Sequence, residues 1–260
     1  MAEEHWTVQL FLEHPDRFLP IHEAGLPYGP DQVTRLEQIL QQAGVRGRRL
    51  LDAPSGIGRH AVHFAKRGWR VVGLELVPAY VRRATDLAEE LGVEGWVTFL
   101  EGDLREVASS LHDEEPFDAI VNLLTSLGYW DDATDLAILR QFHDLASPGG
   151  VLVLDVINRD FVIRHFEPTS FEEYGTIAYR ERRTLDLATS RIESRWTFYR
   201  KEGDSLTDPV SVNISQRVYP PHELSHLLQE AGWADVKVFG GWDLKPLSAD
   251  QSRLLAVARK

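Results

Sequence analysis

Apolar and polar residues follow two different periods along the chain, and each change of period marks a predicted element. Two short apolar runs flank a stretch of helical period in which Ala61, Phe64 and Ala65 share one face. This order predicts a strand, a glycine-containing loop, a helix and a second strand within residues 50–75. We therefore expect a βαβ unit with parallel strands in this part of the chain.

The rest of the chain repeats these two patterns and then departs from them. Helical periodicity predicts helices at 30–43, 78–91, 131–146 and 221–231, and apolar runs predict strands at 96–100, 117–121 and 151–156. Residues 159–219 alternate with the period of a strand instead, from Ile177 to Ile214. They predict two or three antiparallel strands inserted after the fifth parallel strand of a single domain spanning 1–260.

The loop of the βαβ unit carries the first indication of a ligand. Gly56 and Gly58 lie between the strand and the helix, where the absence of a Cβ lets the backbone approach a ligand and the first N–H groups of the helix point toward it. Glu75 ends the second strand, where a carboxylate can accept hydrogen bonds from both hydroxyls of a ribose. The unit predicts binding of a nucleoside-containing cofactor.

Two further carboxylates bear on which cofactor this is. The glycine spacing also fits a dinucleotide, so an NAD(P)-dependent oxidoreductase stays open as an alternative. Asp52, at the end of the first strand, would repel a diphosphate and hold a cationic amino group. Asp103, after the third strand, suits the exocyclic amine of an adenine. Together they favour S-adenosyl-L-methionine over NAD(P).

Five segments carry a family resemblance over about residues 45–158. LLDAPSGIGRHA, VVGLE, EGDLR, FDAIVNLLTSLGYW and SPGGVLVLDV resemble, in this order, the motifs of class I S-adenosylmethionine-dependent methyltransferases. Pro54 replaces the first glycine of the usual loop, which gives a DxPxGxGRH variant. The resemblance implies an α/β fold, with a Rossmann-like, seven-stranded, mostly parallel sheet, helices on both faces, and chemistry at the carboxyl ends of the strands.

The strand ends and the resemblance together predict the site residues. Predicted cofactor contacts are Tyr28, Asp52, Ala53, Gly56, Gly58, Arg59, His60, Glu75, Leu76, Gly102, Asp103, Leu104, Asn122 and Leu123. Predicted acceptor-side residues are Tyr129, Asn158 and Tyr219, with His165 as a weaker candidate for a base, although each also has a packing interpretation. The predicted reaction is methyl transfer to a nitrogen or oxygen of a small-molecule acceptor.

Two segments outside the core have alternative interpretations. Residues 1–29 are rich in aromatic residues and prolines, and form either a packed tail or a lid over the cofactor in which Tyr28 makes the contact. The inserted strands either roof the acceptor site or form the interface of a homodimer. Tyr179, Trp196 and Tyr199, expected on an exposed face, fit both interpretations.

Composition and charge exclude several classes. The chain has no cysteine, which excludes disulfides, thiolate zinc sites, cysteine-ligated iron–sulfur clusters and cysteine nucleophiles. A net charge of −12, and Asn122-Leu123-Leu124-Thr125 in place of the Asn/Asp-Pro-Pro-aromatic motif of base methylases, argue against a nucleic-acid partner. No apolar run approaches a membrane span and the N-terminus lacks a signal-peptide pattern, so we expect a cytoplasmic protein.

One motif suggests a different chemistry. His222-Glu223-Leu224-Ser225-His226 matches the HExxH pattern of zinc hydrolases. Because it directly follows Pro220-Pro221, His222 would lie in the first helical turn, and the stretch also reads as an ordinary amphipathic helix. We predict no metal site and keep the zinc hydrolase as an alternative.

Overall fold

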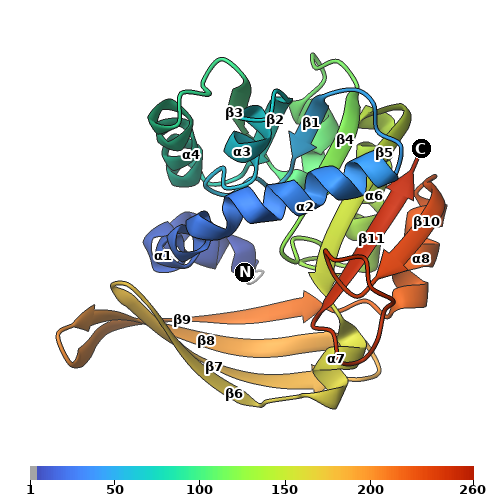
Figure 1. The fold of residues 1–260 in the computed structure, drawn as a ribbon. Helices are drawn as coiled ribbons and strands as arrows, with labels where there is room; N and C mark the ends of the chain where they lie inside the picture. The colour runs from blue at the N-terminus through green and yellow to red at the C-terminus, as the bar shows by residue number, and fades with distance from the viewer. Residues whose placement is uncertain (1–4) are drawn as a thin grey trace.

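A seven-stranded sheet forms the centre of the computed structural model, which describes residues 5–260 (Figure 1). Its strands are β1 (Arg49–Asp52), β2 (Arg70–Glu75), β3 (Val97–Glu101), β4 (Phe117–Asn122), β5 (Ala146–Ile157), β10 (Ala234–Phe239) and β11 (Arg253–Arg259). They lie in the order β10-β11-β5-β4-β1-β2-β3, and β11 runs antiparallel to both of its neighbours. The predicted mostly parallel, Rossmann-like sheet is confirmed.

Helices cover both faces because successive strand residues point to opposite sides. Leu50 packs with α2 (Gly29–Gln42), α3 (Ala61–Ala65) and α4 (Pro78–Glu90), whereas Leu51 packs with the helices on the other face. Those helices are α5 (Val107–Ser110), α6 (Asp132–Leu145) and α8 (Pro221–Glu230), with the short 3₁₀ turn η3 (Leu104–Glu106) before α5. The strands are therefore buried from both sides, which explains their near-continuous apolar runs.

The N-terminal segment is mostly helical, although it contains three prolines. A π-helical turn η1 (Val8–Glu13) leads into α1 (Pro15–Gly25), and the 3₁₀ turn η2 (Leu26–Tyr28) joins it to α2. Pro15 occupies the first turn of α1, where a missing N–H costs nothing, and Pro20 lies inside the helix. The helix lies between the two sheets and contacts both α4 and the inserted strands (Figure 1).

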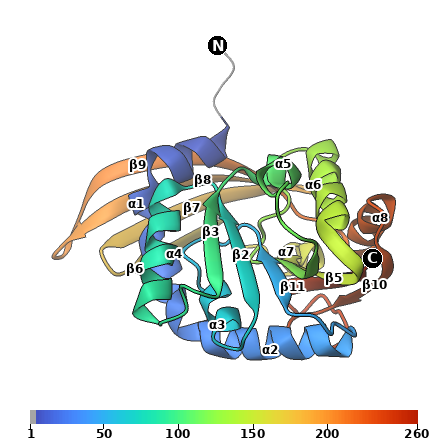
Figure 2. The same ribbon diagram turned by 90° about the horizontal axis from the view of Figure 1, so that it is seen from above.

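The inserted region forms a second sheet with four strands, so the prediction of two or three was too low. After α7 (Arg159–Arg164), the strands β6 (Thr169–Tyr174), β7 (Ile177–Asp186), β8 (Arg191–Glu202) and β9 (Ser205–Arg217) pair antiparallel in chain order. The missed strand is β6, whose residues are mostly exposed and which therefore shows no alternation of apolar and polar positions. In the view from above, this sheet extends beyond the core beside α1 (Figure 2).

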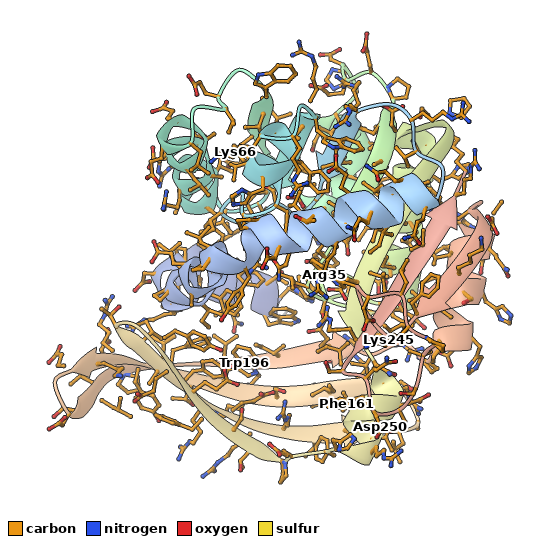
Figure 3. All side chains as sticks on the ribbon, viewed as in Figure 1. Arg35, Lys66, Phe161, Trp196, Lys245 and Asp250 are labelled. Atoms are coloured by element: carbon orange, nitrogen blue, oxygen red, sulfur yellow. The ribbon has the colours of Figure 1, made fainter. Side chains whose placement is uncertain are left out.

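One face of the inserted sheet is covered by the N-terminal segment. Trp6 and Leu10 pack against Tyr179, Phe198 and further residues of β7 to β9. Tyr179 is therefore only 7% exposed, and the prediction that it lies on an exposed face was wrong. Trp196, labelled in Figure 3, is on the same side of the sheet. It stacks on Phe18 of α1, with 6.2 Å between the ring centroids.

Among the helices of residues 5–260, none combines the length and the apolar composition that crossing a bilayer requires.

Candidate functional site

A cavity of about 340 Å³ opens at the carboxyl ends of β1 to β4, beneath the N-terminal helices. Nine of the predicted cofactor residues line it: Gly56, Arg59, His60, Glu75, Leu76, Gly102, Asp103, Leu104 and Leu123. The volume lies within the range of small-molecule sites, which is roughly 300–1,000 Å³. The strand ends that the sequence placed together thus meet at one cavity.

The glycine loop and Glu75 form the polar floor of this cavity. The Gly56 N–H donates to Glu75 Oε2 at 2.9 Å, and the Val77 N–H donates to Oε1 at 3.0 Å. Gly56 has a φ of +55°, and a Cβ there would lie 3.3 Å from the ring of His22. Burial raises the pKa of Glu75 to about 7, although the backbone N–H groups oppose the shift.

Four other predicted cofactor residues lie in or next to the glycine loop but do not line the cavity: Asp52, Ala53, Gly58 and Asn122. Asn122 Nδ2 donates to the Ala53 carbonyl at 2.8 Å, and a Cβ on Gly58 would lie 2.7 Å from Phe99. Asp52 is 1% exposed. The expectation that its carboxylate faces the ligand directly with Glu75 and Asp103 was wrong, because Asp52 is buried and does not line the cavity.

Asp52 remains coupled to the cavity through charge. Burial raises the pKa of Asp52 to about 7, and the Arg59 guanidinium and the Ala61 backbone N–H oppose this shift. Arg59 in turn lines the cavity. Asp52 and Arg59 are therefore electrostatically coupled.

Arg59 is a partly buried cation that lines the cavity. It makes no hydrogen bond and no ion pair within 4.0 Å among residues 5–260, and burial lowers its pKa. Its guanidinium packs against Gly25 of α1, where any side chain would collide with it. Because a partly buried guanidinium without hydrogen-bond partners has lost part of its hydration, this arrangement suits an anionic group of a ligand.

Asp103 lines the cavity but is already partly engaged. Its carboxylate accepts from the Arg105 backbone N–H at 2.8 Å and from the Arg105 guanidinium at 2.6 Å. Burial favours the neutral acid, yet these bonds outweigh it, and the pKa of Asp103 is lowered. A ligand amine at this position would share the carboxylate with Arg105.

The N-terminal helix contributes residues that the sequence analysis missed. Phe18, Ile21 and His22 of α1 line the cavity. Burial and the neighbouring Arg59 lower the pKa of His22 to about 4, so the imidazole is neutral at physiological pH. The signal that could have found them is the spacing of Phe18, Ile21 and His22, which places them on one helical face.

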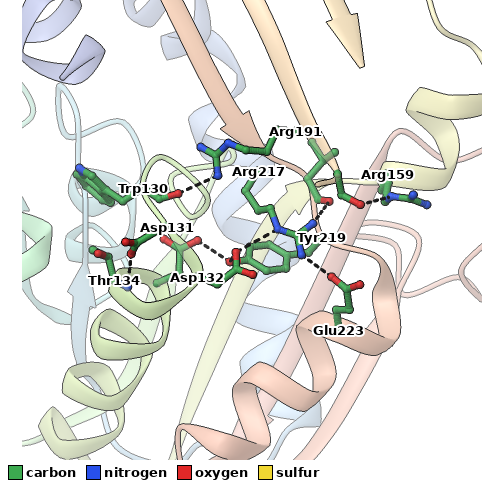
Figure 4. Close-up of polar contacts among 12 residues, drawn as sticks. Trp130, Asp131, Asp132, Thr134, Arg159, Arg191, Arg217, Tyr219 and Glu223 are labelled. Atoms are coloured by element: carbon green, nitrogen blue, oxygen red, sulfur yellow. Dashed lines mark hydrogen bonds and ion pairs between the residues drawn. The ribbon is translucent and has the colours of Figure 1, made fainter. Parts of the chain in front are cut away.

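Of the three predicted acceptor-side residues, the cavity contains Tyr129. Asn158 caps α7, accepting from the Asp160 N–H at 3.1 Å and donating to two backbone carbonyls, so its prediction was wrong. Tyr219 is also misplaced: its hydroxyl donates to the buried Asp135 at 2.7 Å, in the polar cluster of Figure 4. Both residues follow a strand or a hinge, but their side chains point away from the cavity.

Two weaker candidates also lie elsewhere. Tyr28 is 64% exposed and does not line the cavity, because it belongs to the turn between α1 and α2. His165 is half-exposed and lies 3.6 Å from Asp250, also outside the cavity. Neither is placed to contact the cofactor or the acceptor.

The loop that carries Tyr129 is held by the inserted sheet. Gln216 of β9 donates to the carbonyls of Thr125 and Leu127, at 3.1 and 3.4 Å. Gly128, with a φ of +96°, lies against β9 so closely that a Cβ would be 2.4 Å from the Arg217 carbonyl oxygen. Arg191 of β8 donates to the Trp130 carbonyl at 3.0 Å (Figure 4).

The HExxH stretch is used structurally. Glu223 accepts from Arg217 Nη2 at 2.5 Å and is therefore engaged in an ion pair (Figure 4). Within the described part of the chain, no three His, Asp or Glu side chains are grouped as metal ligands would be. The zinc hydrolase alternative is not supported.

Comparisons with known proteins agree with the resemblance found in the sequence. Residues 50–150 match a family model described as a methyltransferase domain. A tRNA 5-carboxymethoxyuridine methyltransferase of Escherichia coli is 32% identical over 130 residues, which are 50% of this chain and 48% of the relative. The chain thus matches about half the length of the first curated relatives.

Solved structures share the fold over most of the chain. The CcbJ methyltransferase from Streptomyces caelestis aligns with a TM-score of 0.73 and 18% identity, covering 90% of this chain and 89% of that one. CalS10, an amino pentose methyltransferase from Micromonospora echinaspora solved with S-adenosylmethionine bound, aligns with a TM-score of 0.67 and 23% identity, covering 92% and 97%. These likenesses confirm the fold class.

Proposed function

We propose that the protein transfers a methyl group from S-adenosyl-L-methionine to a nitrogen or oxygen of a small-molecule acceptor; the match of residues 50–150 to a methyltransferase domain model supports this. The observation that supports this most strongly is the cavity at the strand ends, where Glu75, the glycine loop and an unpaired Arg59 meet. The cofactor would supply a methyl group already activated by a positively charged sulfur. The protein's own task is to position two reactants.

The residues of the cavity fit this cofactor group by group. Glu75 suits the ribose hydroxyls, since it lies at the end of β2 with its carboxylate fixed by two backbone N–H groups. Arg59, which has no partner among residues 5–260, suits the carboxylate of the methionine part. The Ser55 hydroxyl is buried in the cavity wall without a hydrogen-bond partner in the described chain, and thus offers a further polar contact.

The enclosure of the cavity supports a small acceptor. The N-terminal segment supplies Phe11, Phe18 and His22 to the cavity, and the inserted sheet packs on the other side of that segment. We interpret residues 5–29 as a lid and the inserted sheet as the roof that supports it. A large acceptor would have to displace both.

Calorimetric titration with S-adenosylhomocysteine tests the proposal. We expect micromolar binding, a loss of at least about 100-fold in Glu75→Ala, and a smaller loss in Glu75→Gln. Glu101→Ala is the matched control, because Glu101 ends the neighbouring strand in register with Glu75 but is exposed. Tight binding of NAD(P) in place of S-adenosylhomocysteine would overturn the proposal and restore the oxidoreductase alternative.

A further inference from the structure

Aromatic rings form a continuous wall of the cavity. Phe11 and Phe18 come from the N-terminal segment, and Tyr129 and Trp130 from the loop after β4. The ring centroid of Phe11 lies 5.4 Å from that of Phe18 and 6.2 Å from that of Tyr129. The ring centroids of Tyr129 and Trp130 are 5.7 Å apart. The interplanar angles are 84°, 40° and 63°, so neighbouring rings are inclined to one another.

Rings outside the cavity hold this wall in place. Trp6 contacts Tyr129 edge-on at 4.8 Å, and its indole N–H donates to the Ser215 carbonyl of β9. Phe18 stacks on Trp196 of the inserted sheet. The wall is therefore braced by both the N-terminal segment and the roof.

The carboxylates and imidazoles that line the cavity in the described chain are either engaged in hydrogen bonds or weakly basic, and the proposed function assigns Glu75 to the ribose hydroxyls. Glu75 already accepts two backbone N–H groups and Asp103 is bound to Arg105. Burial and Arg59 lower the pKa of His22 to about 4, which makes it a weak proton acceptor. His60 is hydrogen-bonded to Gln32 at 2.9 Å. A hydroxyl acceptor needs a base to remove its proton during transfer, whereas a neutral amine does not.

We propose, on the basis of the proposed function, that the acceptor group is a neutral amine and that Phe11, Phe18 and Tyr129 stabilise the ammonium formed on it. As the nitrogen lone pair forms the new C–N bond, the C–S bond breaks, its electron pair stays on sulfur, and the positive charge moves from sulfur to nitrogen. Any hydrogen on that nitrogen is lost to water after the product leaves. Aromatic faces attract such a cation without accepting a proton from it.

Two matched probes test this inference without knowledge of the acceptor. Choline carries a trimethylammonium group, and 3,3-dimethylbutan-1-ol has the same shape without the charge. We expect the complex with S-adenosylhomocysteine to bind choline with a Kd in the range of about 1–10 mM, and the neutral probe about tenfold more weakly, as measured by calorimetry or ligand-observed NMR.

Substitutions of the aromatic residues test whether their rings cause the preference for choline. Phe11→Leu and Phe18→Leu keep an apolar side chain but remove a ring, and each should reduce the preference for choline about threefold. Phe171→Leu is the control, since Phe171 lies on β6, is 50% exposed and does not line the cavity.

The possible failures are distinguishable. Equal affinities for the two probes, or no choline binding at about 50 mM, in a protein that binds S-adenosylhomocysteine would overturn the amine inference alone. Absence of S-adenosylhomocysteine binding would overturn the proposed function as well.

Discussion

The two sides of the cavity are built in different ways. The floor comes from a contiguous stretch, in which the Gly56 N–H binds the Glu75 carboxylate only 19 residues away. The lid and roof depend on contacts between distant parts of the chain, such as Trp6 with Ser215, 209 residues apart. Local backbone geometry therefore fixes the proposed cofactor side, whereas tertiary packing fixes the proposed acceptor side, and the two should respond differently to substitution.

The substitution expected to affect the acceptor side most, and the cofactor side least, is Gly128→Ala. A Cβ at Gly128 would lie 2.4 Å from a backbone oxygen of β9, and its φ of +96° disfavours any side chain, so the loop that carries Tyr129 must move. We expect methyl transfer to fall by about 100-fold or more, because small misplacements in a site have large effects on rate. Binding of S-adenosylhomocysteine should change less than about threefold.

A second glycine serves as the control for backbone strain. Gly175 also has a positive φ, of +55°, but a Cβ there would meet nothing within 4 Å. Gly175→Ala should reduce thermal stability slightly and leave transfer unchanged. If Gly128→Ala and Gly175→Ala gave the same kinetics, the loop would not depend on the inserted sheet.

The same contrast explains what the sequence could predict. Strand periodicity and the spacing from Gly56 to Glu75 determine where the strand ends meet, and nine predicted residues do line the cavity. Asn158 and Tyr219 were misassigned because a position after a strand does not determine where a side chain points. His22 was missed because the prolines of residues 1–29 argued against a long helix there, whereas α1 tolerates Pro20 and packs between two layers.

The floor should show a pH dependence that the roof does not. Burial raises the pKa of Glu75 from 4.5 to about 7, so the folded, cofactor-free protein holds this proton more tightly than the unfolded chain does. Its contribution to stability is therefore lost as pH rises from about 4.5 to 7. Asp52, whose pKa burial also raises to about 7, acts in the same direction.

Cofactor binding should reverse this preference, because ribose hydroxyls donate to the ionised carboxylate. We expect the affinity for S-adenosylhomocysteine to fall by up to about tenfold per pH unit below pH 7, with protons released on binding. Calorimetry in two buffers of different ionisation enthalpy measures that release. The release should decrease in Glu75→Gln; an unchanged value would assign it to another group.

Gln216→Ala should disturb the contact between the inserted sheet and the Tyr129 loop less than Gly128→Ala does. The variant removes the hydrogen bonds to Thr125 and Leu127 while leaving the backbone free of collisions. We expect kcat to fall about threefold to tenfold with little change in S-adenosylhomocysteine affinity, corresponding to one or two lost hydrogen bonds. Gln229→Ala, at an exposed position of α8, is the control and should leave both values unchanged.

The smallest effect is expected at the ion pairs that join the lid to the roof. Arg200 of β8 binds Asp16 of α1 at 2.6 Å and Asp208 of β9 at 3.1 Å, and Arg17 of α1 also pairs with Asp208. Because the Arg200 side chain is 49% exposed, Arg200→Ala should destabilise the protein by no more than about 1 kcal/mol, and by less at high salt.

This small loss of stability should still be visible locally. Hydrogen exchange should accelerate in α1 and at the β8–β9 hairpin while the protection of β1 and β2 stays the same, since the seven-stranded core does not depend on these pairs. Lys237→Ala, which removes a surface pair on β10 with 3.5 Å between the charged atoms, is the matched control. Equal acceleration in α1 and in β1 would mean that the lid unfolds with the core, and that floor and roof form one cooperative unit.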